Sequence, residues 1–196
     1  DAHLVIRMQG VLTRLQRELG ITFVHVTHSQ SEAFAMADRV VIMSRGEIAQ
    51  VGAPRDIYRA PANRFVAEFV GRNNIIAGVV APEGPGFGLL RVDTPLGPFD
   101  VVADDAPRPP GDAAVFVVGA DRVEIGRDPR PGAVPCTLIS EEFIGSVVTL
   151  FLEAPDGTEL KVQAQERALA ALDAGSGGAF HLSWSPQEAH LLPPGA

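Results

Sequence analysis

The stretch of sequence that defines a fold most clearly lies at residues 146–163 and reads SVVTLFLEAPDGTELKVQ. Apolar and β-branched residues fill its two arms, 146–153 and 158–163, and Pro155, Asp156 and Gly157 stand between them. A turn signal between two such arms is typical of a β-hairpin. The stretch therefore predicts a hairpin in the second half of the chain.

Short apolar segments separated by turns continue on both sides of this hairpin, from about residue 73 to the end of the chain. One helix is predicted, at Glu166–Leu172, and many short strands at such spacing favour a small barrel or sandwich. The further predicted strands are 75–80, 88–92, 98–103, 114–119, 134–140 and 179–184.

The first 52 residues follow a different pattern, in which helices alternate with strands. Apolar residues at steps of three and four predict a first helix that ends at Gly20. The run Ile21–Val26 predicts a strand covered on both faces, and Ser29 with Glu32 has the spacing of a capping box for a helix at about 30–37. With two more strands at 39–43 and 47–51, the order is that of an α/β domain.

A short helical connector separates these two regions. Pro54 and Pro61 flank a helical segment at 55–59, and Asn63 is placed to cap a second one. The sequence thus predicts three parts: an α/β region at 1–52, a helical connector at 53–72 and an all-β domain at 73–196.

Composition excludes several classes of function. The 196 residues carry a formal net charge of −8, and a nucleic-acid-binding protein needs a basic surface that this chain does not show globally. The single cysteine, Cys136, can form no internal disulfide, and no metal-ligand spacing surrounds it, so a structural role is expected. No apolar run reaches the length of a membrane span, and no signal peptide is present.

The best candidate for chemistry is His28, in the run Thr27–Gln30 that follows the predicted strand 21–26. Ligands of open α/β sheets lie beyond the carboxyl ends of strands, and an imidazole can hydrogen-bond a phosphate oxygen. Two structural roles compete with this one: His28 caps the next helix, or it satisfies a buried carbonyl. His25 is interpreted as a packing residue.

Three segments resemble the switch-histidine region of ABC-transporter ATPases: VTHSQSEA at 26–33, ADRVVIM at 37–43 and GEIAQVG at 46–52. The resemblance extends without a gap back to Asp1, which aligns with the end of the D-loop of that family. It implies that His28 contacts the γ-phosphate of ATP, with Asp1 as a second nucleotide-facing residue. In the family an acidic residue follows the histidine, whereas Ser29 follows it here.

Other parts of an ABC ATPase do not occur in this sequence. It contains no Gly-x-x-x-x-Gly-Lys-Ser/Thr loop, no signature segment, no Q-loop and no Walker B carboxylate before the D-loop. We therefore expect the chain to be a C-terminal fragment that neither binds ATP and Mg²⁺ tightly nor hydrolyses ATP, whereas its full-length parent is an ATPase.

The connector and the β region indicate which kind of ABC ATPase the chain resembles. GAPRDIYRAPANRFVAEFVG at 52–71 resembles the connection in importer ATPases for polyamines, ferric iron and sugars, in which an OB-like TOBE domain follows. The predicted hairpin at 146–163, with Phe143–Gly145 before it, resembles the central hairpin of that domain. Polyamine or ferric iron is favoured as the solute by residues 52–71, and sugar stays open.

The resemblance implies an importer subunit that energises solute uptake at the inner face of the cell membrane. Its expected partners are a second copy of itself, two transmembrane permease subunits and, indirectly, a solute-binding protein. The alternative is an OB-like module that binds an oxyanion or a regulator without an ATPase role. Its polar candidates are Arg122, Arg127, Ser140, Ser146 and Lys161.

Overall fold

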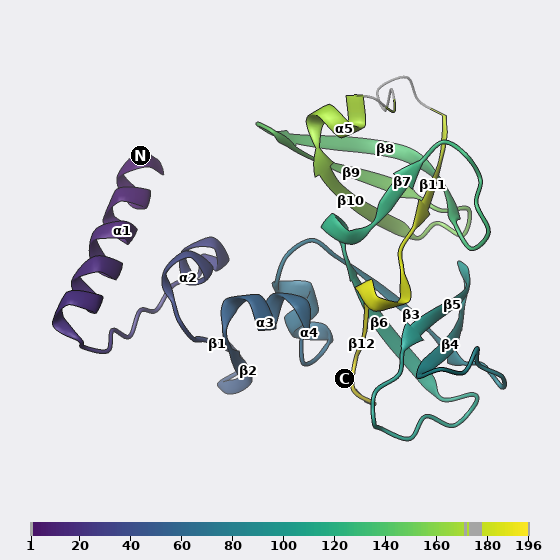
Figure 1. Ribbon diagram of the computed structural model, residues 1–196, viewed down its shortest axis with the longest axis horizontal. Coiled ribbons are helices and arrows are strands. Elements are labelled where there is room, and N and C mark those ends of the chain that lie inside the picture. Colours follow the sequence, from purple (N-terminus) through teal and green to yellow (C-terminus); the bar gives the residue numbers. More distant parts are fainter. Residues whose placement is uncertain (1, 171, 173–177, 196) are drawn as a thin grey trace. The chain divides into compact units, whose positions relative to one another are not determined.

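The structure, a computed structural model, describes residues 2–170, 172 and 178–195 (Figure 1). Its backbone contacts divide the chain into two compact units, Asp1–Ala62 and Asn63–Ala196.

The first unit contains three helices and one β-hairpin. The helices are α1 (Ala2–Leu19), α2 (Gln30–Met36) and α3 (Pro54–Arg59), and the hairpin joins β1 (Val40–Ser44) to β2 (Glu47–Gly52) in antiparallel pairing. Gly20 ends α1 with a φ of +61°, as its position predicts. Arg45 and Gly46 both have positive φ, which is the geometry of a two-residue hairpin turn.

The predicted strand Ile21–Val26 is not formed. These residues lie in an irregular segment between α1 and α2, and Val24 and Val26 are 89% and 86% exposed. A strand needs a neighbour that satisfies its backbone groups, and among the described residues only β1 and β2 form a sheet in this unit. The parallel pairing of an α/β sheet is therefore not seen, although helices and strands do alternate.

The second unit begins with α4 (Arg64–Phe69), whose first turn is capped by Asn63 as the sequence predicts: Val66 N–H donates to Asn63 Oδ1 at 2.9 Å. Among its described residues, two five-stranded antiparallel sheets follow. The first has the order β12-β6-β3-β4-β5 and the second the order β10-β9-β8-β11-β7. Five strands make up the first sheet: β3 (Asn73–Val80), β4 (Leu89–Thr94), β5 (Gly97–Val102), β6 (Ala113–Gly119) and β12 (Ala189–Leu191).

The second sheet contains the hairpin that the sequence predicts. It joins β9 (Val147–Glu153) to β10 (Glu159–Gln165), and every residue of β10 has a partner in β9. The other strands are β7 (Glu124–Gly126), β8 (Val134–Ile144) and β11 (Ala179–Ser183), and α5 (Glu166–Ala170) follows β10 (Figure 1).

The two sheets share one hydrophobic core. Phe116 of the first sheet and Leu150, Leu152 and Phe180 of the second are fully buried in it. Phe99 stacks on Trp184 with ring centroids 4.8 Å apart, which adds an aromatic contact at the margin of the core. Cys136 is 3% exposed in this core, so its expected structural role agrees with its position.

Gly78 lies near the end of β3, where β6 pairs with one side of the strand and β4 with the other. β3 pairs with β6 over Asn73–Val79 and with β4 at Val79 and Val80. A Cβ atom on residue 78 would lie 2.3 Å from Asp93 O, a distance too short for any Cβ atom in a folded protein. The missing side chain therefore allows β4 to approach β3 closely.

Candidate functional site

His28 lies in the loop before α2, and the residues on both sides of it are held by hydrogen bonds. Thr27 Oγ1 donates to Glu32 Oε2 at 2.6 Å and accepts from Ser29 N–H at 3.0 Å. Ser29 Oγ accepts from Glu32 N–H at 3.3 Å and so caps α2. The backbone on either side of His28 is therefore fixed by short side chains.

The His28 side chain itself is exposed. Because Ser29 caps α2, His28 does not have the capping role considered for it, and an exposed ring does not satisfy a buried carbonyl. An exposed imidazole beside a fixed backbone can donate a hydrogen bond to an anionic ligand. The His28 side chain can therefore make one hydrogen bond to a phosphate oxygen.

The predicted capping box is half formed. Ser29 caps Glu32 as expected, but the Glu32 carboxylate accepts from Thr27 Oγ1, and Ser29 N–H donates to Thr27 Oγ1. In a complete capping box the Glu32 carboxylate would accept a hydrogen bond from Ser29 N–H. Here the Thr27 hydroxyl lies between these two groups and bonds to both. This replacement ties the loop on both sides of His28 to α2.

The interpretation of His25 as a packing residue is wrong. Its side chain is 50% exposed, and its Nε2 lies 3.7 Å from Glu32 Oε2. His25 and Thr27 therefore both face Glu32. Asp1, the second predicted nucleotide-facing residue, lies outside the described residues. In the part of the chain that the structure describes, no group of three His, Cys, Asp or Glu side chains is placed to hold a metal ion.

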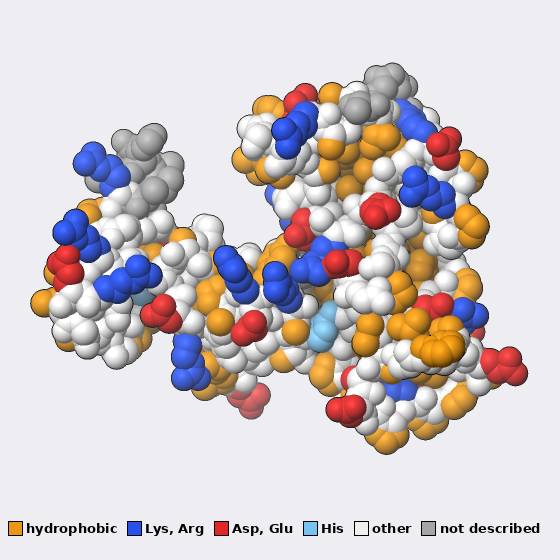
Figure 2. Space-filling view, viewed as in Figure 1, with side chains coloured by type: hydrophobic (Ala, Val, Ile, Leu, Met, Phe, Trp, Pro, Cys, Tyr) orange, Lys and Arg blue, Asp and Glu red, His pale blue; other side chains and the backbone are white. Residues whose placement is uncertain are grey.

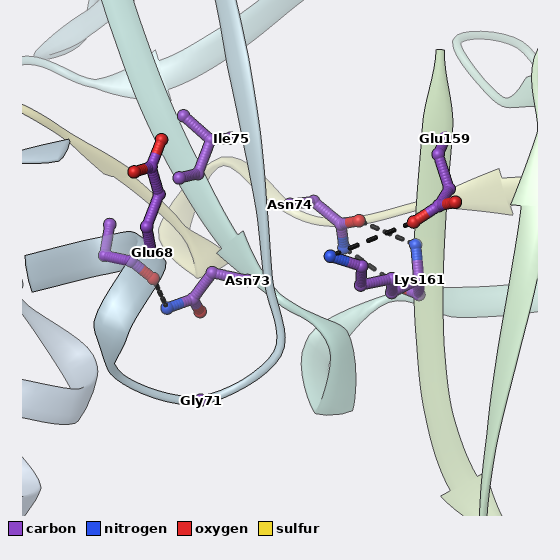
Figure 3. Close-up of a pocket in the computed structure, with 8 residues that line it drawn as sticks. Glu68, Gly71, Asn73, Asn74, Ile75, Glu159 and Lys161 are labelled. Carbon is purple, nitrogen blue, oxygen red and sulfur yellow. Dashed lines mark hydrogen bonds and ion pairs between the residues drawn. The ribbon is translucent and has the colours of Figure 1, made fainter. Parts of the chain in front are cut away.

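The second unit contains an open cavity of about 290 Å³ beside the start of β3 (Figure 3). Glu68 and Asn73 line one side, and Glu159 and Lys161 of β10 line the other. Glu68 is paired with Arg64 at 2.8 Å, and Lys161 Nζ lies 4.0 Å from Glu159 Oε1. The charges in the cavity are therefore compensated within the chain and select no ligand of one sign.

Two neighbouring asparagines, Asn73 and Asn74, line this cavity, and sequence reasoning missed both. Asn73 Nδ2 donates to Ala67 O at 2.8 Å and to Val70 O, which closes the end of α4. Asn74 is 4% exposed; its Nδ2 donates to Lys161 O at 2.9 Å and its Oδ1 accepts from Lys161 N–H at 2.7 Å. The only signal was an Asn-Asn pair directly before an apolar strand.

The polar candidates for a ligand site in the β region lie on different elements. Only Lys161 lines the cavity described above. Arg122 pairs with Glu188, and the Arg127 guanidinium lies 4.0 Å above the ring of Phe180. Ser146 lies in the turn between β8 and β9, and Ser140 lies on β8 itself. The structure thus does not assemble these five residues into one site.

The β region is similar to a known domain family. The family model of the TOBE domain matches residues 116–192. Among solved structures, the cytoplasmic molybdate-binding protein ModG, solved with molybdate bound, is similar with a TM-score of 0.55 and 19% identity, covering 61% of this chain and 96% of ModG. At this identity the likeness shows the fold alone, which is the OB-like β fold expected from the sequence.

Curated relatives are similar to this chain over nearly its whole length. The spermidine/putrescine import ATP-binding protein PotA of Thermobifida fusca (strain YX) is 35% identical over 197 residues, which is 98% of this chain and 50% of that protein. PotA of Nitratidesulfovibrio vulgaris is 40% identical over 172 residues, 82% of this chain and 44% of that protein. PotA of the onion yellows phytoplasma is 56% identical over 80 residues.

These matches confirm the resemblance to ATP-binding subunits of ABC importers that the sequence indicates. The chain spans about half the length of the curated relatives it matches. Its fold is an α/β unit followed by an all-β, OB-like TOBE domain. Among the described residues, no helix is both long and apolar enough to cross a bilayer.

Proposed function

We propose that the chain is part of the ATP-binding subunit of an ABC importer and that the complete subunit hydrolyses ATP to energise solute uptake. The observation that carries this proposal is the similarity to spermidine/putrescine import ATP-binding proteins over 98% of the chain. The TOBE domain at 116–192 supports the same assignment.

In this proposal His28 is the residue that contacts the γ-phosphate of ATP. Its ring is exposed, and the backbone on both sides of it is held to Glu32 through Thr27 and Ser29. Phosphoryl transfer depends on several positioned groups and on Mg²⁺, and this chain contributes one imidazole hydrogen bond to them. Asp1 is proposed as a second nucleotide-facing residue.

The three predicted parts have separate roles in the proposed subunit. Residues 1–52 belong to the ATPase domain, 53–72 are the connector, and 73–196 form a regulatory domain that also helps two copies to dimerise. Two membrane permease subunits and, indirectly, a solute-binding protein complete the importer. The subunit works at the cytoplasmic face of the membrane. The named relatives favour a polyamine as the solute.

The test is an uptake assay in cells that lack the complete subunit. We expect uptake of radiolabelled spermidine or putrescine to be lost and to return when the subunit is supplied, because solute movement is coupled to its ATPase. Unchanged polyamine uptake with lost ferric iron or sugar uptake would reject the polyamine assignment alone. Unchanged uptake of all three solutes would contradict the importer role.

The isolated chain supplies a second test. Titration calorimetry of the chain with Mg·ATP is expected to show no tight binding, because the phosphate-cradling loop does not occur in the sequence. A sub-micromolar dissociation constant would contradict the role proposed for this part. The likeness to ModG shows the fold alone, so it does not support the alternative of an oxyanion-binding module.

A further inference from the structure

We propose that Thr27 is a positioning residue for His28, an inference that rests on the proposed contact between His28 and the γ-phosphate. The hydroxyl of Thr27 makes two hydrogen bonds. It donates to Glu32 Oε2 at 2.6 Å and accepts from Ser29 N–H at 3.0 Å. The second bond joins the two neighbours of His28, so it closes a short ring that contains the backbone of His28.

The carboxylate of Glu32 sets the direction of the Thr27 hydroxyl. A hydroxyl has one hydrogen and two lone pairs, whereas a carboxylate has only acceptor oxygens. The hydrogen of Thr27 therefore points to Glu32, and a lone pair is left to accept from Ser29 N–H. Because the two bonds support each other, loss of either the hydroxyl or the carboxylate loosens the backbone that carries His28.

These bonds do more than cap α2. Glu32 lies in the first turn of α2, and its N–H donates to Ser29 Oγ, which is the cap itself. A loop that only had to cap the helix could bond Ser29 N–H directly to the Glu32 carboxylate. The Thr27 hydroxyl between these groups brings the residue before His28 into the network. The backbone on both sides of the imidazole is thereby held, which capping alone does not require.

A fixed backbone matters because the His28 ring is exposed. An exposed ring takes its position from its own backbone more than from side chains packed around it. A shift of about 1 Å in a group that contacts a reacting substrate can slow the reaction about a hundredfold. We therefore expect the Thr27 hydroxyl to act on turnover through the place at which it holds the His28 ring.

The charges beside α2 are compatible with an anionic ligand. α1 contacts α2, and its described side chains from residue 7 onward include Arg7, Arg14 and Arg17 but one acidic residue, Glu18. Figure 2 shows basic side chains over α1. This helix does not repel a phosphate group, so the position of the imidazole is what Thr27 has to secure.

The experiment measures steady-state ATPase kinetics of the complete subunit. Thr27→Val keeps the shape of the side chain and removes both hydrogen bonds. It is expected to lower kcat at least about threefold and to change KM for ATP less than about twofold, because the contact acts in the transition state. Thr27→Ser keeps the hydroxyl and should restore kcat. The control is Thr22→Val, the same change at an exposed residue of the preceding segment.

Glu32 supplies an independent pair of variants. Glu32→Ala removes the acceptor of the Thr27 hydrogen and should lower kcat as Thr27→Val does. Glu32→Gln keeps an acceptor oxygen and should retain more of the activity. Hydrogen exchange measured by mass spectrometry is expected to be faster at residues 27–32 in Thr27→Val than in wild type, since Ser29 N–H loses its acceptor.

A double variant separates positioning from a purely structural role. Thr27→Val combined with His28→Ala should be no slower than His28→Ala alone, because Thr27 acts only through His28. A structural role would make the two losses multiply. Multiplied losses, or normal kcat in Thr27→Val, would overturn the inference. Circular dichroism establishes that each variant is folded.

Failure of the inference is distinguishable from failure of the proposed function. Slow turnover in His28→Ala together with normal turnover in Thr27→Val would reject the positioning role alone. Normal turnover in His28→Ala would reject the proposed γ-phosphate contact and the positioning role with it.

Discussion

His28 shows how far a single residue can be understood from sequence. Its position after an apolar run left structural roles open, and the structure replaces them with an exposed ring beside a capped helix. The hydroxyl of Thr27, which holds that loop to Glu32, was not foreseen because it takes the place of a bond within the expected capping box. Local motifs indicate which residues cap a helix but not which neighbour completes the cap.

For the complete subunit, His28→Ala is expected to leave ATP binding largely intact and to lower turnover by more than about tenfold, because hydrogen bonds to a transferring phosphoryl group act mainly in the transition state. Steady-state ATPase kinetics and nucleotide titration measure the two effects. His25→Ala is the matched control, since His25 faces Glu32, and should keep most of the activity. Normal turnover in the His28 variant would remove it from the mechanism.

Asn74 carries a structural prediction at the same scale. Asn74→Ala leaves the N–H and C=O of Lys161 without their partners in a nearly buried place, so we expect a loss of about 2 kcal/mol in the free energy of unfolding. Urea denaturation measures the loss. Gln165→Ala changes an exposed side chain on the same strand and should have little effect. An equal loss in both variants would show that β10 tolerates no change at all.

The Asp104–Arg108 pair gives a dependence on pH. The hydrogen bond from Arg108 holds the pKa of Asp104 below its usual 3.8, and Arg108 also donates to Leu192 O. A carboxylate with a lowered pKa in the folded state stabilises the protein above the unfolded value, and this stability is lost as pH falls through the folded value.

Asp104→Asn is therefore expected to lower the thermal midpoint at pH 6, and the difference from wild type should shrink as the pH falls below about 4. Scanning calorimetry at several pH values measures it, with the exposed neighbour Asp105→Asn as the control. A difference that stayed constant down to pH 2 would assign the effect to packing rather than to charge.

At the scale of elements, the β region was largely predictable because its turns are marked by Gly, Pro and Asp. The eight strands predicted between residues 75 and 184 all occur, with bounds that differ by at most four residues. The two strands that were missed, β7 and β12, have three residues each, too few for alternation to be visible. The false strand at 21–26 has the opposite cause: its residues suit a strand, but pairing is a property of the neighbours.

Gly78 provides the test at this scale. Gly78→Val places a Cβ atom 2.3 Å from Asp93 O and side-chain atoms against Val92, so we expect β4 to separate from β3 at a cost of about 3 kcal/mol. Denaturant titration measures the cost. Gly126→Val is the control, because a Cβ there meets nothing within 4 Å. Equal stability of the two variants would contradict the close approach of β4 to β3.

At the scale of the whole molecule, Cys136 reports on the shared core of the β domain. Burial raises the pKa of its thiol to about 11, and the side chain is 3% exposed between the two sheets. At pH 8 we expect its reaction with a disulfide reagent to be more than about a hundredfold slower in the folded than in the urea-unfolded chain, since the thiolate is the reactive form. Labelling in the folded protein at the unfolded rate would show that the sheets separate readily.

The backbone contacts divide the chain between Ala62 and Asn63, a point that lies inside the connector predicted at 53–72, where proline and glycine signals occur throughout. The nature of both units was predicted more securely than their boundary. Repeated turn residues and alternating apolar and polar residues indicate a β domain wherever its strands begin. A boundary between units depends on contacts between distant residues, which local sequence patterns do not show.

The amide of Asn74 has a further consequence, which concerns length. Its two hydrogen bonds cross from one sheet to the backbone of the other, so the length of one short side chain sets how far β3 stands from β10. Asn74→Gln keeps both hydrogen-bonding groups and adds one methylene. The two hydrogen bonds to Lys161 can then form only if β3 and β10 move apart. Between the two sheets Asn74 therefore acts as a spacer, and we expect homologous domains with a different distance between these strands to differ at this position.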